Sequence, residues 1–181
     1  MLDPTILLNL QPAMPPARPE TTIERQHLPP HLEAVQRLAD RKASQYEEAV
    51  AAWAGNLQKQ RDYLGAVAPS RQMSEDELAV VTRVIDDIET EAELRAGALR
   101  RLVKRIARST KPFFATSAAA GAAARSFGNR LVRADEQAIE ALLEHALYLR
   151  AFRAARSPGT RGGPVFDDPD ALDSYLKAEL A

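Results

Sequence analysis

The sequence predicts an all-α protein: a long antiparallel coiled-coil helical hairpin with additional packed helices (a helical bundle), a Pro-rich N-terminal arm and a short C-terminal helix. Ala and Leu dominate the 181 residues and lose little entropy in a helix, whereas only 6% of the chain is aromatic. Apolar residues recur at alternating spacings of three and four along two long segments, as in helices with one buried face. Seven of the 12 prolines lie within residues 1–30, outside both segments.

Residues 1–30 form the N-terminal arm, which is rich in proline and shows little periodicity. This composition predicts an extended segment, either disordered or laid along a partner. The arm holds one apolar stretch containing Ile6, Leu7 and Leu8, which is either a docking peptide for a partner protein or a frayed terminus. Because this stretch has no basic lead and includes an early acid and proline, it is a poor secretory signal.

Residues 32–108 carry the hairpin, within a helical domain of residues 31–156. Each apolar series spans about four heptads, enough for an a/d seam. Folding the chain back near residue 72 pairs positions whose numbers sum to 145, so that Trp53 would face Ala92, a large side chain against a small one. The first series is 39, 43, 46, 50, 53, 57, 60, 64 and 67, and the second is 78, 81, 85, 88, 92, 95, 99, 102 and 106.

The turn between these helices carries a helix-start signal. Ser74 and Glu77 predict a capping box, in which the Ser74 hydroxyl accepts from the backbone N–H of Glu77 and the Glu77 carboxylate reaches back. Met73 and Leu78 flank the box as a hydrophobic staple. The acidic first turn also suits the positive end of the helix dipole. The second hairpin helix is therefore expected to begin here.

Two seam positions are polar, Gln60 and Arg95. One interpretation is that a polar core group specifies the register or the partner at some cost in stability. The other is that the aliphatic stem of Arg95 lies on the seam while its guanidinium reaches Glu47, Glu91 or water.

Two further helices are expected after the hairpin. Pro112 ends or kinks the second hairpin helix, because the residue before a proline avoids helical backbone. Residues 113–127 predict a third helix rich in small residues, which allows close approach to another helix. Gly128 and Asn129 together signal a helix stop and restart, so a fourth helix is expected over residues 130–156.

Residues 157–167 predict a flexible linker, and residues 168–181 predict an acidic amphipathic helix. A short helix on a tether is typical of a docking peptide, but this acidic helix is equally able to fold back onto the basic part of its own chain. The expected partner-docking residues are Phe166, Leu172, Tyr175 and Leu176, together with Ile6, Leu7 and Leu8 of the arm.

The sequence argues against an enzyme. It contains no Cys, no Gly-rich phosphate-binding loop and no zinc-ligand spacing. His145 follows Glu144, but adjacent helical residues point about 100° apart and do not share a metal ion, so His145 is interpreted as a boundary residue of the fourth helix. No catalytic residue, metal, cofactor or small-molecule substrate is expected. Because no segment approaches the ~20 apolar residues that span a bilayer, a cytoplasmic location is expected.

Charge is segregated along the chain, although the net charge is only −1. Residues 68–94 carry eight acidic and two basic residues, whereas residues 95–134 carry ten basic residues and no acidic one. Such a basic block contacts nucleic-acid phosphates, or it stays solvated or pairs with acidic segments of the same or a neighbouring chain. The candidate nucleic-acid or anion contacts are Arg101, Lys104, Arg105, Arg108 and Lys111.

The leading functional expectation is a non-enzymatic helical scaffold or adaptor that acts through protein–protein contacts or self-association, for example as a subunit of a larger assembly. The hairpin, the two tether-like ends and the alternating charge blocks favour it. The alternative is a nucleic-acid-associated subunit that uses the basic helix face over residues 95–111. A further alternative is a regulator or inhibitor of a toxin or enzyme, which the sequence does not separate from the first.

Overall fold

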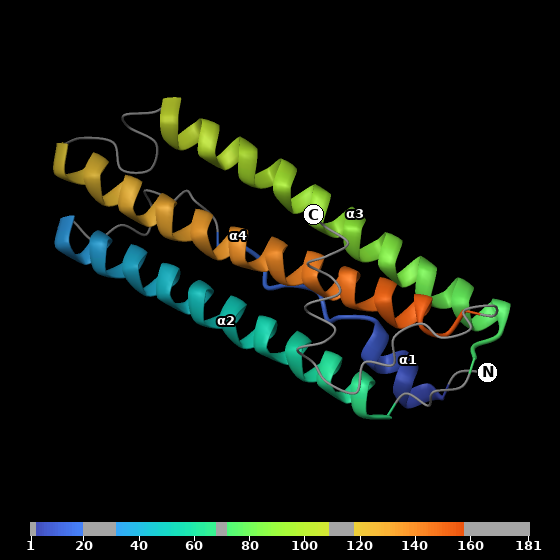
Figure 1. The fold of residues 1–181 in the computed structure, drawn as a ribbon. Coiled ribbons are helices and arrows are strands. Elements are labelled where there is room, and N and C mark those ends of the chain that lie inside the picture. The colour runs from blue at the N-terminus through green and yellow to red at the C-terminus, as the bar shows by residue number, and fades with distance from the viewer. Residues whose placement is uncertain (1–2, 20–31, 68–71, 109–117, 158–181) are drawn as a thin grey trace.

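The structure, a computed structural model, describes residues 3–19, 32–67, 72–108 and 118–157. Over these ranges the chain forms α1 (Pro4–Leu10), α2 (Leu32–Val67), α3 (Glu75–Arg108) and α4 (Ala118–Ala154), with no strand (Figure 1). The predicted all-α class is confirmed.

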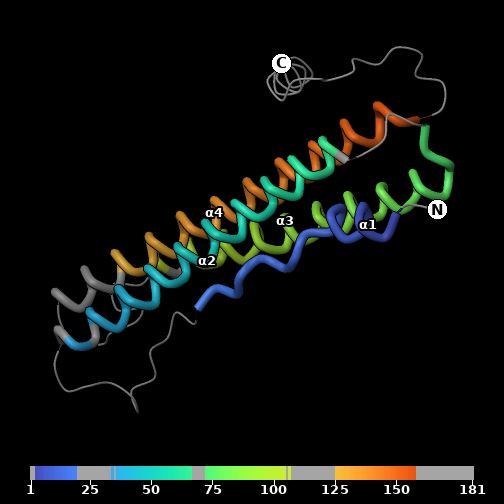
Figure 2. The backbone as a smooth tube through the Cα atoms, turned by 90° about the horizontal axis from the view of Figure 1, so that it is seen from below, coloured from blue at the N-terminus to red at the C-terminus, as the bar shows by residue number. Residues whose placement is uncertain are grey.

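Three long helices form the body of the bundle. α4 lies between α2 and α3 and packs against both, and α3 runs opposite to the other two (Figure 1). The N-terminal segment covers a different side. α1 packs against α2, and residues 11–19 then continue as an extended chain that runs alongside the long helices (Figure 2). We call residues 3–19 the docked arm; it occupies the position that a fourth long helix takes in a four-helix bundle.

The two hairpin helices have the predicted bounds, but their main packing partner is α4 rather than each other. The heptad pattern nevertheless identified the buried faces, since Leu57 and Ile88 are only 1% and 3% exposed. α4 carries an apolar face of similar length, and three such faces form one shared core. Burial of a large apolar side chain contributes roughly 1.5–3 kcal/mol. The fully buried large apolar residues include Leu10, Leu57, Leu64, Phe127, Leu131, Leu142 and Leu149.

α4 is one continuous helix where two were predicted. Gly128 and Asn129, expected to form a helix stop, lie inside it. A Gly within a helix costs about 1 kcal/mol relative to Ala. Burial of the neighbouring Phe127 and Leu131, at 1% and 0% exposure, outweighs that cost. The start of the predicted third helix, residues 113–117, lies outside the described residues.

The docked arm begins with a helix that was not predicted. Asp3 caps α1 by accepting a hydrogen bond from the backbone N–H of Thr5 at 2.7 Å, which lowers the pKa of Asp3, and Pro4 occupies the first turn. Ile6 and Leu10 face the core, with 7% and 0% exposure. Residues 4–10 are therefore helical rather than extended.

The predicted capping box at the start of α3 is confirmed. The backbone N–H of Ser74 donates to Glu77 Oε2 at 3.0 Å, and the backbone N–H of Glu77 donates to Ser74 Oγ at 3.3 Å. Met73 and Leu78, the predicted staple, both pack in the core. Met73 also donates its N–H to the carbonyl of Arg156 at 3.0 Å. The beginning of α3 is thereby tied to the residues that follow α4.

Candidate functional site

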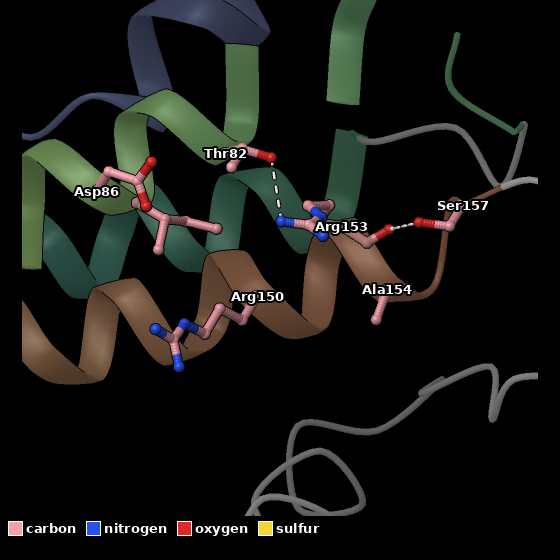
Figure 3. A pocket seen from close by; sticks show the side chains of 7 residues that line it. Thr82, Asp86, Arg150, Arg153, Ala154 and Ser157 are labelled. Carbon is pink, nitrogen blue, oxygen red and sulfur yellow. Dashed lines mark hydrogen bonds between the residues drawn. The ribbon is translucent and has the colours of Figure 1, made fainter. Parts of the chain in front are cut away.

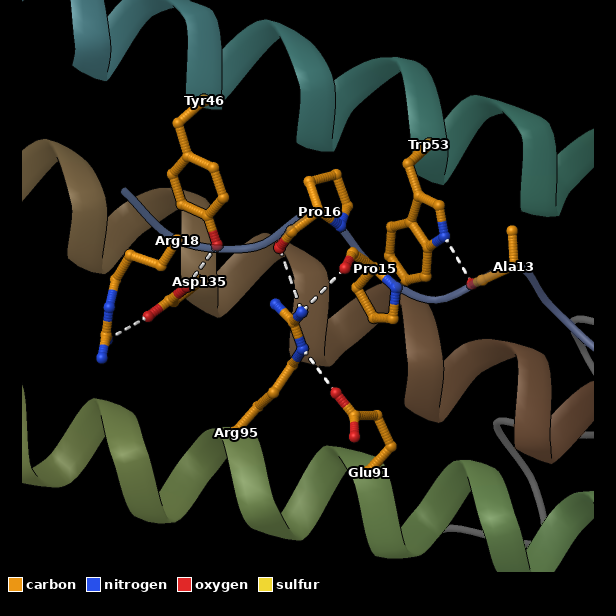
Figure 4. Close-up of polar contacts among 9 residues, drawn as sticks. All are labelled: Ala13, Pro15, Pro16, Arg18, Tyr46, Trp53, Glu91, Arg95 and Asp135. Atoms are coloured by element: carbon orange, nitrogen blue, oxygen red, sulfur yellow. Dashed lines mark hydrogen bonds and ion pairs between the residues drawn. The ribbon is translucent and has the colours of Figure 1, made fainter. Parts of the chain in front are cut away.

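The candidate site with the most specific contacts is the groove that holds residues 11–19. We call it the arm groove; α2 and α3 form its walls, and α4 lies beneath the arm (Figure 4). Prolines have no N–H, and an extended chain makes no internal hydrogen bonds. The carbonyl groups of this Pro-rich segment therefore depend on donors that the groove supplies.

Two side chains from the walls bind carbonyl groups of the arm. Trp53 on α2 donates its Nε1–H to the carbonyl of Ala13 at 2.9 Å. Arg95 on α3 donates from Nη2 to the carbonyls of Pro15 and Pro16, each at 3.0 Å. Pro15 is also buried. The groove thus holds this part of the arm mainly by its main chain.

These contacts explain one of the two polar seam positions. Arg95 occupies a position of the predicted seam, and its Nε donates to Glu91 Oε1 at 2.9 Å, which confirms one of the acceptors named from the sequence. Glu47, another of those acceptors, instead accepts two hydrogen bonds from Arg130, which lower the pKa of Glu47. Gln60 has a buried Oε1 without a hydrogen-bond partner among the described residues, and nothing in the structure explains its amide there.

A buried carboxylate anchors the far end of the docked arm. Asp135 on α4 is 4% exposed and accepts a hydrogen bond from Arg18 Nη1 at 2.6 Å. Its other oxygen accepts from the hydroxyl of Tyr46 on α2. Burial and the neighbouring Asp135 carboxylate raise the pKa of Tyr46, so that Tyr46 remains a neutral donor. Because an unpaired buried carboxylate is costly, the arm stabilises the bundle by bringing the Arg18 cation.

The buried imidazole of His145 contacts the docked arm at Leu10, the last residue of α1. His145 is 0% exposed, and its Nε2 lies 3.1 Å from the carbonyl oxygen of Leu10. Burial lowers the pKa of His145 to about 4, although the Leu10 carbonyl opposes this shift. The ring is therefore neutral, and the proton is assigned to Nε2 because a carbonyl only accepts. The interpretation of His145 as a boundary residue is wrong, since the side chain is fully enclosed by α4 and its neighbours.

A second candidate site is a shallow apolar depression on the outer surface of α3 and α4, which the arm does not fill. We call it the α3/α4 strip. Leu143, one of the residues that line it, is 45% exposed. Exposed apolar groups that cluster in this way are typical of contact sites. The strip is lined by Leu99, Ile139, Leu143 and Leu147, with Glu136, Glu140 and Glu144 beside them.

A second depression lies between α3 and α4 near the turn (Figure 3). Arg153 Nη1 donates to Thr82 Oγ1 at 3.0 Å, and Ser157 Oγ donates to the Arg153 carbonyl at 3.1 Å. Arg150, which also lines the depression, pairs with Glu89 at 2.5 Å. Its two cations are thus engaged within the chain, as is common for surface pairs.

The predicted anion-contacting residues lie at the end of α3. Arg101 and Lys104 are exposed, and neither forms an ion pair with a described residue. Arg105 and Arg108 belong to α3, but their side chains are outside the described part of the chain, as is Lys111. Two of the five residues are therefore shown to share an exposed helix end.

The predicted docking residues divide into three groups. Ile6 is 7% exposed and packs into its own chain, so the expectation that it docks to a partner is wrong; α1 turns it inward. Leu7 and Leu8 are 39% and 76% exposed. The residues of the C-terminal segment, Phe166, Leu172, Tyr175 and Leu176, lie outside the described residues.

Sequence reasoning missed the residues that build the arm groove. The sequence predicts Trp53 and Tyr46 on a seam between the two hairpin helices, and it indicates no role for Asp135 or Arg18. One signal was available, because Asp135 falls on the buried face of α4, four residues after Leu131. An acid at such a position calls for a cation or donor from another element.

Comparison with protein-family models, with curated proteins and with solved structures finds no significant match for this chain. In the described ranges, no helix is long and apolar enough to cross a membrane. Among the same residues, no group of His, Asp and Glu side chains is placed to hold a metal ion. The function is therefore argued from the geometry of the arm groove, the α3/α4 strip and the basic end of α3.

Proposed function

We propose that the protein is a non-enzymatic helical scaffold or adaptor that binds a partner protein through the α3/α4 strip. The observation that carries this proposal is the exposure of Leu143 beside the partly buried Leu99, Ile139 and Leu147. A well-packed bundle that leaves a contiguous apolar strip uncovered favours an interaction surface, whereas a single exposed apolar residue does not.

The partner element that fits this strip is an amphipathic helix with basic residues beside its apolar face. Ile139, Leu143 and Leu147 recur every four residues along α4, as helix-in-groove packing requires. A row of carboxylates, from Glu136, Glu140 and Glu144, lies beside them. Glu144 already pairs with Arg61 of α2 at 3.4 Å, whereas the exposed Glu136 and Glu140 favour lysine or arginine on the partner. The chain's own residues 168–181 are rich in Asp at their start and match this row poorly.

The use of the buried ionisable groups also favours a structural role over catalysis. Asp135 binds Arg18 and Tyr46, Arg95 binds prolyl carbonyls, and His145 binds the Leu10 carbonyl. A catalytic acid, base or nucleophile needs access to a substrate. Instead, each of these groups forms a hydrogen bond with a residue of the docked arm.

Site-specific cross-linking tests the proposal. A photo-reactive amino acid replaces Leu143 in one variant and the exposed Glu48 of α2 in a matched control, and both are irradiated in extracts of the native host. We expect a discrete cross-linked partner from position 143 only, with the linked peptide being amphipathic and basic.

The binding of that purified partner then provides the quantitative test. Leu143→Lys should weaken the complex at least about tenfold, because one exposed apolar anchor is lost and a like charge faces the basic helix. Leu8→Lys, on α1, should leave it unchanged. Products from both cross-linking positions alike, or loss of binding with Leu8→Lys and not with Leu143→Lys, would contradict the strip as the docking surface.

The second candidate function is nucleic-acid binding at the end of α3. It is favoured by the exposure of Arg100, Arg101 and Lys104 without an ion pair to any described residue. Binding to a short duplex should weaken steeply with salt, and the double change Arg101→Glu and Lys104→Glu should reduce the slope of that dependence by about two. The control is Lys59→Glu on α2. Absence of binding at low salt would eliminate this candidate.

A further inference from the structure

The docked arm makes the contacts of a bound peptide. Its residues 11–19 are extended, and the groove binds them through three carbonyl groups and one terminal cation. All the donors and the acceptor on the groove side belong to α2, α3 and α4. This arrangement separates a recognition surface from the segment that it recognises, although both lie in one chain.

The chemistry of the groove suits a proline-rich ligand. Pro16 lies between Tyr46 and Trp53 (Figure 4), two aromatic side chains that lie about two turns apart on α2. Proline-rich segments are already extended before binding, so they lose little entropy, and aromatic-lined grooves with fixed N–H donors recognise them. Arg95 supplies both N–H contacts to the prolyl carbonyls.

The arm residues that face the groove define a motif. Pro15 is buried and Pro16 is partly buried, whereas Met14 is 81% exposed and Ala17 is exposed. Arg18 then reaches the buried Asp135. In the arm, two consecutive prolines are thus followed, two positions later, by the arginine that binds Asp135.

We infer that the arm groove is a binding site for proline-rich peptide segments of the pattern Pro-Pro-x-Arg, and that the docked arm is its intramolecular occupant. A partner protein that carries such a segment displaces the arm and binds Trp53, Arg95 and Asp135 in its place. The inference does not depend on the α3/α4 strip, which lies on the outer surface of α3 and α4. It adds a second binding surface whose availability the chain itself controls.

The covalent connection sets the strength of this control. Only residues 20–31 join the arm to α2. Because the arm is covalently joined to its groove, its binding is intramolecular, and a free peptide of equal affinity competes poorly against it. Cleavage of the tether removes that advantage. Peptide binding should therefore be at least about a hundredfold tighter after cleavage than before.

The experiment uses the full chain with a specific protease site inserted between residues 20 and 31. After cleavage, a fluorescent synthetic peptide of residues 1–19 is added, exchange is followed by anisotropy, and the helical content is followed by circular dichroism. We expect exchange without loss of helix. The Arg18→Gln peptide should bind at least about tenfold more weakly, because the buried Asp135 loses its cation. The Met14→Ala peptide should bind as well as the parent.

Variants of the groove give an independent measure. Arg95→Met should weaken the peptide at least about tenfold, whereas Arg100→Met, an exposed position on the same helix, should not. A peptide with both Pro15→Ala and Pro16→Ala should bind several-fold more weakly, because it is less extended when free. The peptide variants keep the test informative if Arg95→Met fails to fold.

Three results would overturn the peptide-binding role of the groove, and a fourth would overturn its intramolecular occupancy. The first is a cleaved arm that does not exchange, and the second is an arm whose release unfolds the bundle; either makes the arm a permanent part of the core. The third is equal binding of the parent and Arg18→Gln peptides. A stable dimer of the intact chain in sedimentation, with arms exchanged between copies, would assign the groove to a second copy and refute the intramolecular occupancy.

Discussion

The burial of His145 makes the stability of the bundle depend on pH. His145 titrates with a pKa of about 4 in the folded chain, against 6.5 for an ordinary histidine. The unfolded chain therefore binds a proton more readily than the folded chain between these two values. The contribution that the neutral His145 makes to the free energy of unfolding is fully present above pH 6.5 and is lost as the pH falls toward 4.

The size of the loss follows from the two pKa values. At pH 5 the unfolded imidazole is mostly protonated, whereas the folded imidazole is still mostly neutral. Linkage then gives a destabilisation of about 2 kcal/mol at pH 5 relative to pH 7.5. The nearby Arg61 lowers the pKa of His145 further, in the same direction as burial. Other groups titrate over this range too, so the measurement needs a reference that lacks only His145.

His145→Gln provides that reference, because a Gln amide is still able to donate to the Leu10 carbonyl but does not titrate. Urea unfolding of both proteins at pH 7.5 and pH 5 gives four free energies of unfolding. We expect the wild type to lose about 2 kcal/mol more than His145→Gln over this interval. Parallel pH dependences for the two proteins would refute the assignment of His145 as a buried neutral imidazole.

Three further predictions concern the arm and the start of α3. Leu10→Ala should lower the free energy of unfolding by ~2–5 kcal/mol, because Leu10 is fully buried, whereas Leu8→Ala on the exposed side of α1 should change it by less than ~0.5 kcal/mol. Urea unfolding measures both variants, and equal effects would mean that α1 is not docked. Ser74→Ala should cost about 1 kcal/mol in the same assay, because the N–H of Glu77 loses its acceptor, and an unchanged midpoint would contradict the capping box. Trp53→Phe should cost about 1 kcal/mol and increase cleavage of the arm in limited proteolysis, because the Ala13 carbonyl loses its donor; unchanged cleavage would count against that contact.

The sequence was sufficient for the fold class, the bounds of the hairpin helices and their buried faces, because a heptad pattern reports which side of a helix leaves water. It did not identify what each face meets. Two heptad series align with each other in some register whether or not they pack, and the series on α4 competes for the same core. The pattern on α4 in fact continues through Gly128, from Phe127 to Leu131, so periodicity was a better guide there than the glycine.

The candidate site was harder to predict because it joins segments distant in the chain. α1 carries a local signal, an Asp followed by Pro and then apolar residues four apart, and attention to it would have revealed the helix. No local signal connects Arg18 to Asp135 or Trp53 to Ala13. Their partnership depends on the shape of a groove that exists only after three helices have packed.

That dependence has a consequence for how the protein is made. The arm is synthesised before the three long helices, but the Leu10 carbonyl pairs with a residue 135 positions later, and Arg18 pairs with one 117 positions later. Such long sequence separations slow folding, because loop-closure entropy is lost before the contacts form. During translation, the apolar face of α1 therefore has no complete binding site until α4 has been synthesised. A chaperone that shields residues 4–10 in this interval should increase the yield of folded protein.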